Sequence, residues 1–490
     1  MSNFKLTIDD IFKQLKGEKI TPTTLVEESL QRAKKYQQQY NAFVTLIETA
    51  SDEAKQLKGD IDNPLYGVPY ALKDNIATKG ILTTGSSNIL KEYRPVFDAT
   101  VVSKLKKKKA ILIGKTVLDE LAMGGSGTTG HTGKVYNPWD PKRIIGGSSA
   151  GSTAAVALGI VPFALGSDTG NSIRRPAAFG GVVGFKPTYG RISRFGLFPL
   201  ASSLDHIGCL TRSVKDAAYV VDAIKGHDER DMTTLPDDDK VYEHMLDGNV
   251  KGKKLCYIKE IIDLDNDNKE WSSIINNFKL AIKHCEELGM VVEPVTIDKQ
   301  LLKALYPAYL IISGAEATSN NANLTGLLFG NRGRGNTIDD IIFDARTKGF
   351  SRLIKQRFIF GSYVLQKENQ ANFFRNAQRL RRMIVEQIND LFKIYDGLIL
   401  PAARGIAPLL NKEIDDFSDF SLLSENHLLI GNFGGFPSIT IPSGLVDEMP
   451  IGVNITGRIL EDDIVLNIAY ALEAKLGQKG IIARGGREDV

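Results

Sequence analysis

Residues 146–179 read GGSSAGSTAAVALGIVPFALGSDTGNSIRRPAAF, and this stretch decides the fold class. A glycine turn leads into a run of small residues typical of a closely packed helix. The apolar run VPFALGSD (161–168) then predicts a buried strand, and a Gly/Ser/Thr turn leads into a further short helical segment. Apolar strands that alternate with helices are typical of α/β proteins, in which helices cover both faces of a parallel or mixed sheet.

The same alternation continues on both sides of this stretch. The apolar run GVPYALKDNI (67–76) predicts a strand, and TVLDELAMG (116–124) follows the strand AILIG (110–114) as a predicted helix. Residues 374–401 carry the clearest helical periodicity of the chain. The other segments that read as strands are 181–193, 253–260, 291–297, 436–444 and 450–457.

Segments from both ends of the chain are expected to enter one sheet, so we predict a single large domain over 1–490. Its expected parts are N-terminal helices in 1–60, a catalytic core in 61–225, a more peripheral helical and loop region in 226–400, and C-terminal strands and a helix in 401–490 that return to the core.

Composition gives no indication of a nucleic-acid-binding, secreted, membrane-spanning or metal-binding protein. A hydrophobic content of 42% with a net charge of +3 describes an ordinary globular protein and does not indicate nucleic-acid binding by itself. The basic run KLKKKK (104–109) is typical of a solvated helix face. There is no N-terminal signal core and no 18-residue apolar window, which predicts a cytoplasmic protein without a membrane span. Cys209, Cys256 and Cys285 lack paired spacing, so we expect buried thiols and no metal or other cofactor in this chain.

Two serines and a lysine stand out as candidate chemistry: Lys73 at the end of an apolar run, Ser148 in GGSSAGS and Ser172 in SDTGNSIRRP. A serine hydroxyl is a weak nucleophile and needs a base, but the six histidines are scattered and no GxSxG elbow is present. A buried, neutral lysine can serve as that base. The neighbouring Asp74 would favour the charged form if it lay close, so the residues alone leave the protonation state open. Taken singly, each also has an ordinary reading, as a surface lysine, a helix cap or a phosphate-binding turn.

The order and spacing of these motifs resemble the amidase signature family. Lys73 lies in GVPYALKDN, Ser148 follows 75 residues later in GGSSAGS, and Ser172 follows after a further 24 in DTGNSIRRPA. The resemblance extends over nearly the whole chain and includes TVLDELAMG, NPWD, KPTYGRISRFGLFPLASSLDHIG and PIGVNITG. It is strongest to the glutaminase subunits of tRNA-dependent amidotransferases. The fold it implies is an α/β/α sandwich with a large central mixed sheet covered by helices on both faces.

The resemblance implies a Ser–cis-Ser–Lys triad. Ser172 would attack the side-chain amide of glutamine, Ser148 would relay the proton on a cis peptide bond, and neutral Lys73 would act as the base. The main-chain N–H groups from Thr169, Gly170 and Asn171 through to Ser172 itself would bind the oxyanion. The family has a glycine where this chain has Asn171. If this position needs a positive φ, asparagine is the least costly replacement.

The resemblance also implies residues that bind glutamine. Arg357 would hold the α-carboxylate, and Glu425, one methylene longer than the family's aspartate, would hold the α-amino group. Tyr309 matches a tyrosine of the pocket, although Tyr306 is close enough to compete for that alignment. Arg175 replaces the glutamine that usually follows the Ser-Ile-Arg of the family, which adds a positive charge near the site entrance.

The function implied is that of a glutaminase subunit in a heterotrimeric tRNA-dependent amidotransferase. Ammonia from glutamine would pass to a partner and convert Glu-tRNA(Gln) to Gln-tRNA(Gln), with Asp-tRNA(Asn) as a second candidate acceptor. A B subunit would bind ATP, Mg²⁺ and most of the misacylated tRNA, and a small C subunit would wrap around this chain. Two alternatives stay open: a stand-alone small-amide amidase, and a scaffold subunit with an impaired site.

Overall fold

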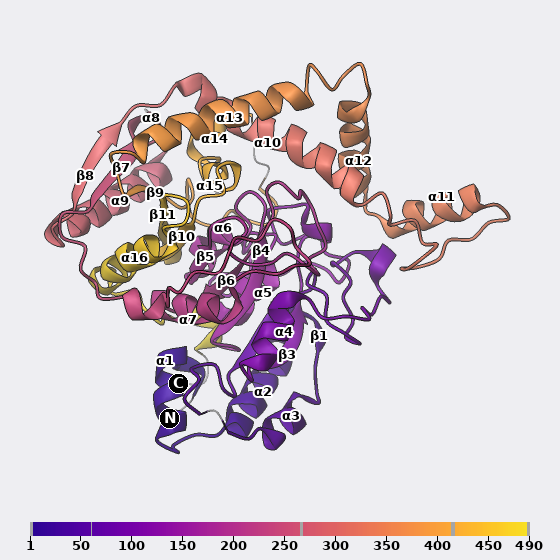
Figure 1. The fold of residues 1–490 in the computed structure, drawn as a ribbon, viewed down its shortest axis with the longest axis horizontal. Helices are drawn as coiled ribbons and strands as arrows, with labels where there is room; N and C mark the ends of the chain where they lie inside the picture. The colour runs from indigo at the N-terminus through magenta and orange to yellow at the C-terminus, as the bar shows by residue number, and fades with distance from the viewer. Residues whose placement is uncertain (1–2, 60, 265–267, 413–416, 488–490) are drawn as a thin grey trace.

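The structure, a computed structural model, describes residues 3–59, 61–264, 268–412 and 417–487. An eleven-stranded sheet runs through the described part of the molecule, in the order β1-β3-β2-β4-β6-β5-β10-β11-β9-β7-β8 (Figure 1). Its strands are β1 (Phe43–Leu46), β2 (Pro69–Lys73), β3 (Ile111–Thr116), β4 (Phe163–Asp168), β5 (Val183–Lys186), β6 (His206–Thr211), β7 (Lys254–Ile258), β8 (Val291–Val295), β9 (Gly397–Pro401), β10 (Ser438–Val446) and β11 (Met449–Gly457).

The sheet is mixed. Strand β2 lies between β3 and β4 and is parallel to both, and β7 is likewise parallel to β8 and β9. The other neighbouring pairs are antiparallel. Strands β10 and β11, from the end of the chain, lie in the middle of the sheet, whereas β7 and β8 form one end of it. The expectation of an α/β fold around a large mixed sheet is confirmed.

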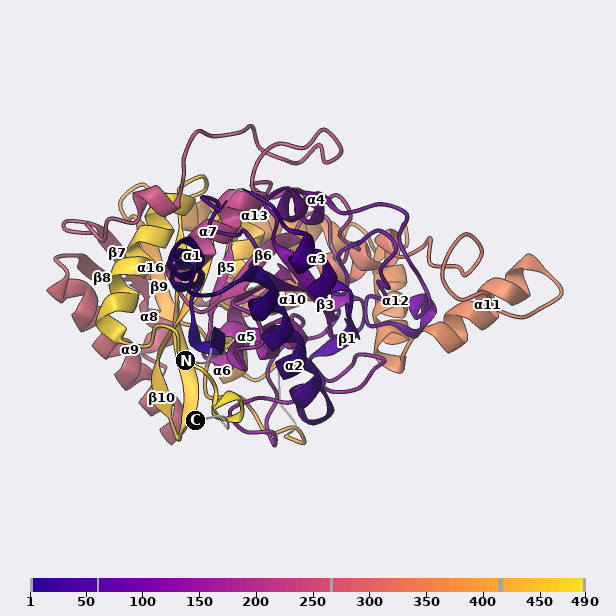
Figure 2. The same cartoon turned by 90° about the horizontal axis from the view of Figure 1, so that it is seen from below.

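The helices surround this sheet, and α11 projects from the body of the molecule in both views (Figure 1, Figure 2). They are α1 (Ile8–Lys16), α2 (Pro22–Tyr40), α3 (Ala50–Gln56), α4 (Thr100–Lys107), α5 (Ala150–Ala157), α6 (Arg174–Gly180), α7 (Val214–Ile224), α8 (Lys259–Ile262), α9 (Lys269–Glu287), α10 (Lys299–Asn320), α11 (Ile338–Gly349), α12 (Arg352–Leu365), α13 (Phe374–Leu391), α14 (Asp419–Ser424), α15 (Leu429–Phe433) and α16 (Asp462–Leu476).

Helices pack on both faces of the sheet, as two glycines of β11 show. A Cβ at Gly452 would point at Ala178 of α6, whereas a Cβ at Gly457 would point at Val465 of α16. Positions separated by an odd number along a strand face opposite sides, so α6 and α16 cover opposite faces. Helix α5 packs against α6, and α7 and α9 pack against α16, which extends both layers.

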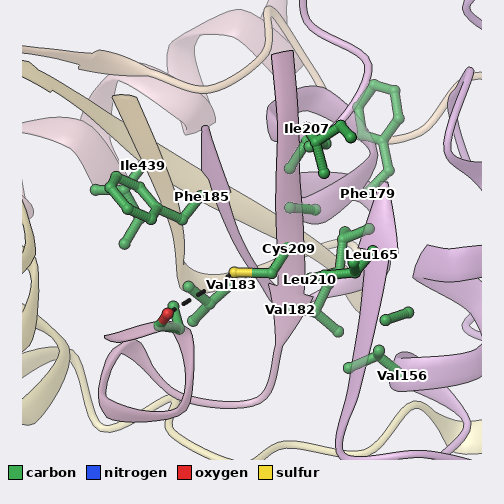
Figure 3. Packing of buried hydrophobic residues seen from close by; sticks show 14 of the residues in the cluster. Val156, Leu165, Phe179, Val182, Val183, Phe185, Ile207, Cys209, Leu210 and Ile439 are labelled. Carbon is green, nitrogen blue, oxygen red and sulfur yellow. Dashed lines mark hydrogen bonds between the residues drawn. The ribbon is translucent and has the colours of Figure 1, made fainter. Parts of the chain in front are cut away.

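The interior is a dense apolar core between these layers. Around Cys209 of β6, side chains from β4, β5 and β10 pack together (Figure 3). The three cysteines are free and buried, as expected of small apolar residues, and burial raises the pKa of the Cys285 thiol to about 12. Residues 104–107 of the basic run end α4, and Lys106 and Lys107 are exposed there, which confirms a solvated helix face. Within the described ranges, no helix has the length and apolarity needed to cross a bilayer.

The predicted helix over 116–124 is wrong. Only a short 3-10 turn forms at Glu120–Ala122, and Leu121 has a φ of 50°. The chain turns here because the buried Asp119 carboxylate accepts hydrogen bonds from the main-chain N–H groups of Gly127, Thr128 and Thr129. A loop therefore wraps around one carboxylate, a long-range constraint that apolar periodicity does not record.

Three strands also escaped sequence analysis. Strand β1 lies inside a segment predicted to be helical, and β9 lies at the end of another such segment. Strand β6 lies in a segment for which the sequence predicts no strand. Helix α13 ends at Leu391, and a turn at 392–394 follows it before β9. These short strands are held by pairing with β3, β4 and β11 respectively. Tertiary pairing overrides local preference in such short segments.

Candidate active site

The three sequence motifs converge at one edge of the sheet. Lys73 ends β2, Ser172 follows the end of β4, and the two strands are parallel neighbours. The carboxyl ends of parallel strands lie at the same edge, where ligand sites of α/β sheets commonly form. Ser148 precedes Ser149, the N-cap residue of α5, and its peptide bond with Gly147 is cis. Ser172 lines a cavity of about 790 Å³.

Lys73 lies fully buried in a cage of hydroxyl groups behind that cavity. Its Nζ donates to Ser148 Oγ at 2.7 Å, to Ser167 Oγ at 2.8 Å and to Ser149 Oγ at 3.0 Å. Burial disfavours the ammonium form and lowers the Lys73 pKa to about 7, although the carboxylates of Asp119 and Asp168 oppose part of this shift. A substantial fraction of Lys73 is therefore a neutral amine near neutral pH.

Asp74, whose influence on Lys73 was open from sequence, points elsewhere. Its Oδ1 lies 3.4 Å from Lys115 Nζ of β3, and its Oδ2 accepts a hydrogen bond from Thr84 N at 2.8 Å. Successive residues at a strand end face opposite sides, so the two neighbours occupy different environments. Asp74 therefore does not pair directly with Lys73, and so it does not hold the Lys73 amine in its protonated form.

The Ser148 and Ser172 turns contact each other through the main chain. Ser149 N donates to Ser172 O at 3.2 Å, and the Ser172 side chain is almost wholly buried where it meets the cavity. Within the described residues no hydrogen bond joins the Ser148 and Ser172 hydroxyls. The structure therefore brings Lys73 and Ser148 into direct contact and places Ser172 beside them.

Two buried carboxylates hold the turn that carries Ser172. Arg174 Nη2 donates to Asp168 Oδ1 at 3.0 Å and to Gly170 O at 2.9 Å, and this guanidinium holds the pKa of Asp168 well below its usual range. On the other side, Thr169 Oγ1 donates to Asp205 Oδ1 at 2.6 Å. Among the described residues, the N–H groups of 169–172 donate to no protein acceptor. Their role as oxyanion-binding groups stays a prediction from the family resemblance.

Neither Gly170 nor Asn171 has a positive φ. Asn171 therefore needs no left-handed backbone, and its replacement of glycine costs nothing on that account. Gly170 is required for space instead, because a Cβ there would lie 2.9 Å from Leu429 Cδ2 and 3.1 Å from the ring of Tyr309. The turn packs closely against the cavity wall.

The residues expected to bind glutamine also meet at this cavity. Tyr309 of α10, Arg357 of α12 and Glu425, which caps the end of α14, all line it together with Ser172. Tyr306 lines it as well, and burial raises the pKa of Tyr309 to about 12. Glu425 is not free, however. It accepts a hydrogen bond from Arg175 at 2.7 Å and forms an ion pair with Arg404 at 3.1 Å.

Several residues that shape the site escaped sequence analysis. Asp205 lies inside the ASSLD motif and Arg174 stands two residues after Ser172, and the sequence predicts no role for either. Asn432 Nδ2 donates to Asp168 O at 3.1 Å across 264 positions of the chain, and Arg404 follows β9 without any motif. Within the described residues no group of three or more acidic, histidine or cysteine side chains could hold a metal ion.

Comparison with known proteins decides the family. The sequence model of the amidase family matches residues 24–466. The chain belongs to the amidase family. A Ser-Ser-Lys triad is typical of this family.

Individual amidases are similar to this chain over nearly its full length. The A subunit of glutamyl-tRNA(Gln) amidotransferase from Lacticaseibacillus paracasei is 38% identical over 97% of this chain and 98% of its own. The crystal structure of the protein of that name from Thermotoga maritima superposes with a TM-score of 0.80 at 35% identity, covering 96% of this chain and 95% of its own. Peptide amidase from Stenotrophomonas maltophilia gives 0.82 at 26% identity, with 99% of both chains covered.

Proposed function

We propose that this amidase is the glutaminase subunit of a tRNA-dependent amidotransferase. It hydrolyses glutamine to glutamate and ammonia, and a partner uses the ammonia to convert Glu-tRNA(Gln) to Gln-tRNA(Gln). The observation that carries the proposal is the 2.7 Å hydrogen bond between Lys73 and Ser148 directly behind the Ser172 turn. Similarity over 97% of the chain to the glutamyl-tRNA(Gln) amidotransferase protein from Lacticaseibacillus paracasei favours this use of the chemistry.

Neutral Lys73 draws a proton from Ser148, and Ser148 takes one from Ser172 as the Ser172 oxygen attacks the amide carbon. The N–H groups of residues 169–172 stabilise the oxyanion of the tetrahedral intermediate. When the C–N bond breaks, the proton returns through Ser148 to the leaving nitrogen and ammonia departs. Water, deprotonated by the same route, then attacks the acyl-enzyme and releases glutamate.

The partners follow from the proposed reaction. A B subunit binds ATP and Mg²⁺, activates the acyl group of the tRNA and makes most of the tRNA contacts. A small C subunit completes the heterotrimer, and the complex works in the cytoplasm. A second acceptor, Asp-tRNA(Asn), belongs to the same chemistry.

A stand-alone small-amide amidase is the second candidate, favoured by the TM-score of 0.82 to a peptide amidase. A scaffold with an impaired site is a third, because two arginines neutralise Glu425. Ammonia release from glutamine, measured for this chain alone and with its B and C partners and charged tRNA, separates the three. Stimulation by partners supports the glutaminase subunit, equal activity on simple amides without partners supports the amidase, and no hydrolysis in any assembly leaves the scaffold.

The nucleophile has its own test within the assembled complex. Ser172→Ala is expected to lower glutamine hydrolysis by roughly 10⁴-fold or more, because no other hydroxyl replaces the attacking oxygen. Amidation of tRNA with added ammonium salt should persist, which shows that the complex is intact. Glutamine hydrolysis by this variant at the wild-type rate would contradict the assignment of Ser172.

A further inference from the structure

Arg175 bridges two walls of the active-site cavity. Its Nη1 donates to Glu425 Oε1 at 2.7 Å, and its Nη2 donates to Gly125 O at 3.0 Å. The side chains of Arg175 and Glu425 are each only 17% exposed. A Cβ at Gly125 would collide with the Arg175 guanidinium, so the absence of a side chain there makes room for it. Arg175 therefore has a defined position in the cavity wall.

Glu425 is paired with two arginines. The second oxygen of Glu425 lies 3.1 Å from Arg404 Nε, so both of its oxygens face guanidinium groups. Glu270 is the other carboxylate among the described residues that line the cavity, and its Oε1 accepts a hydrogen bond from Ile406 N at 2.8 Å. A ligand's ammonium group that reaches Glu425 therefore meets a carboxylate whose charge two guanidinium groups already match.

A ligand's carboxylate, by contrast, can bind an arginine of the cavity that has no partner among the described residues. Arg357 lines the cavity in a half-buried position, and within the described part of the chain its guanidinium forms no hydrogen bond or ion pair. An unpaired guanidinium binds a carboxylate strongly through two parallel hydrogen bonds. The carboxylate of an amino-acid substrate therefore has an unpaired arginine to bind, whereas its α-ammonium group meets a Glu425 side chain that is already paired.

We propose that Arg175 is a specificity-determining residue that masks Glu425, so that the cavity selects its amide substrate by the substrate's carboxylate and does not require an α-ammonium group. The substrate class is then the monoamides of short dicarboxylic acids, of which glutamine is the α-amino member. This inference deepens the proposed glutaminase function and rests on it. It differs from that function in predicting weak discrimination against substrates that lack the amino group.

The test compares glutamine with glutaramate, in which hydrogen replaces the α-amino group. For the wild-type chain in its complex, we expect kcat/KM values for the two amides within about threefold of each other. Arg175→Gln frees Glu425 to bind the ammonium, and a hydrogen bond to a charged group changes affinity by about 10- to 100-fold. The preference of this variant for glutamine should rise by that factor, whereas Arg175→Lys, which keeps the charge, should change the preference less.

Arg143→Gln is the matched control, because Arg143 lines the same cavity but pairs with Asp140 and does not contact Glu425. It should leave the ratio of the two kcat/KM values unchanged. A wild-type preference for glutamine above about 100-fold that Arg175→Gln does not alter would overturn the proposal.

Binding distinguishes failure of this inference from failure of the proposed function. Calorimetric affinities of glutamine and glutaramate for Ser172→Ala, with and without Arg175→Gln, need no turnover. If no variant hydrolyses either amide, the glutaminase function fails, and the ratio of the two affinities still decides whether Arg175 masks Glu425. A rise of that ratio toward glutamine in the Arg175→Gln background supports the masking, and an unchanged ratio overturns it.

Discussion

Two neighbouring strands of this amidase each carry a completely buried lysine, and the two lysines have different bonding partners. Lys73, on β2, is surrounded by the hydroxyls of three serines, whereas Lys115, on β3, faces the carboxylate of Asp74 at 3.4 Å. Burial lowers the pKa of Lys73 to about 7 and that of Lys115 to about 8, and the Asp74 carboxylate opposes part of the shift of Lys115. Equal burial thus leaves the proposed base among hydroxyl groups in one place and a lysine beside a carboxylate in the other.

The largest expected effect is on activity. Lys73→Met leaves an unbranched side chain that is one atom shorter and accepts no proton, so kcat/KM for glutamine should fall by about 10²- to 10⁴-fold, the usual contribution of a general base. Steady-state ammonia release measures it, with far-ultraviolet circular dichroism to confirm folding. Near-normal rates in this variant would mean that Lys73 is not the base.

The second effect is on stability and concerns the other lysine. Lys115→Met leaves the buried Asp74 carboxylate without its partner and should lower the free energy of unfolding by about 3–5 kcal/mol. Lys73→Met, which deprives no carboxylate of a paired cation, should change the free energy of unfolding far less. Urea denaturation of both variants at pH 7 compares them. Equal destabilisation would erase the distinction between the two lysines.

The pH dependence sharpens the comparison further. Because the proposed base must be neutral, kcat/KM should rise with pH through a midpoint near the Lys73 pKa of about 7 and level off above it. Lys73 also affects stability, since its pKa is lower in the folded than in the unfolded chain. Its unfavourable contribution should grow as pH falls from about 10.5 to about 7 and stay constant below that. A pH–rate profile flat between pH 6 and pH 8, roughly one unit either side of that midpoint, would contradict the assignment.

The smallest expected effect concerns the hydroxyl cage. Ser167→Ala removes one acceptor at 2.8 Å from Lys73 Nζ, which destabilises the ammonium form. The midpoint of the pH–rate profile should move down by about 0.5–1 pH unit, the equivalent of one hydrogen bond. Ser152→Ala is the control, because this buried hydroxyl bonds to Leu165 O and not to Lys73. A shift of equal size in the Ser152→Ala control would contradict the claim that the hydroxyl groups around Lys73 set its pKa.

Much of this site could be predicted from sequence because its motifs are local. The proposed triad residues lie at the end of β2, just after β4 and just before α5, each within a short, recognisable stretch, whereas the pairing of β2 with β4 came only from the structure. The helix expected over 116–124 failed because the Asp119 carboxylate bonds to a loop up to ten residues away, which periodicity cannot reveal.

The sequence by itself determined the α/β class, the order of Lys73, Ser148 and Ser172, and the turn that presents the last of them. The tertiary structure alone decided that Asp74 turns away from Lys73 and that Arg175 covers Glu425, a residue 250 positions distant. The physical reason is the distance along the chain over which each effect acts. Propensity and alternation act over a few residues, whereas the partner that sets a buried charge is chosen by packing among segments from the whole chain.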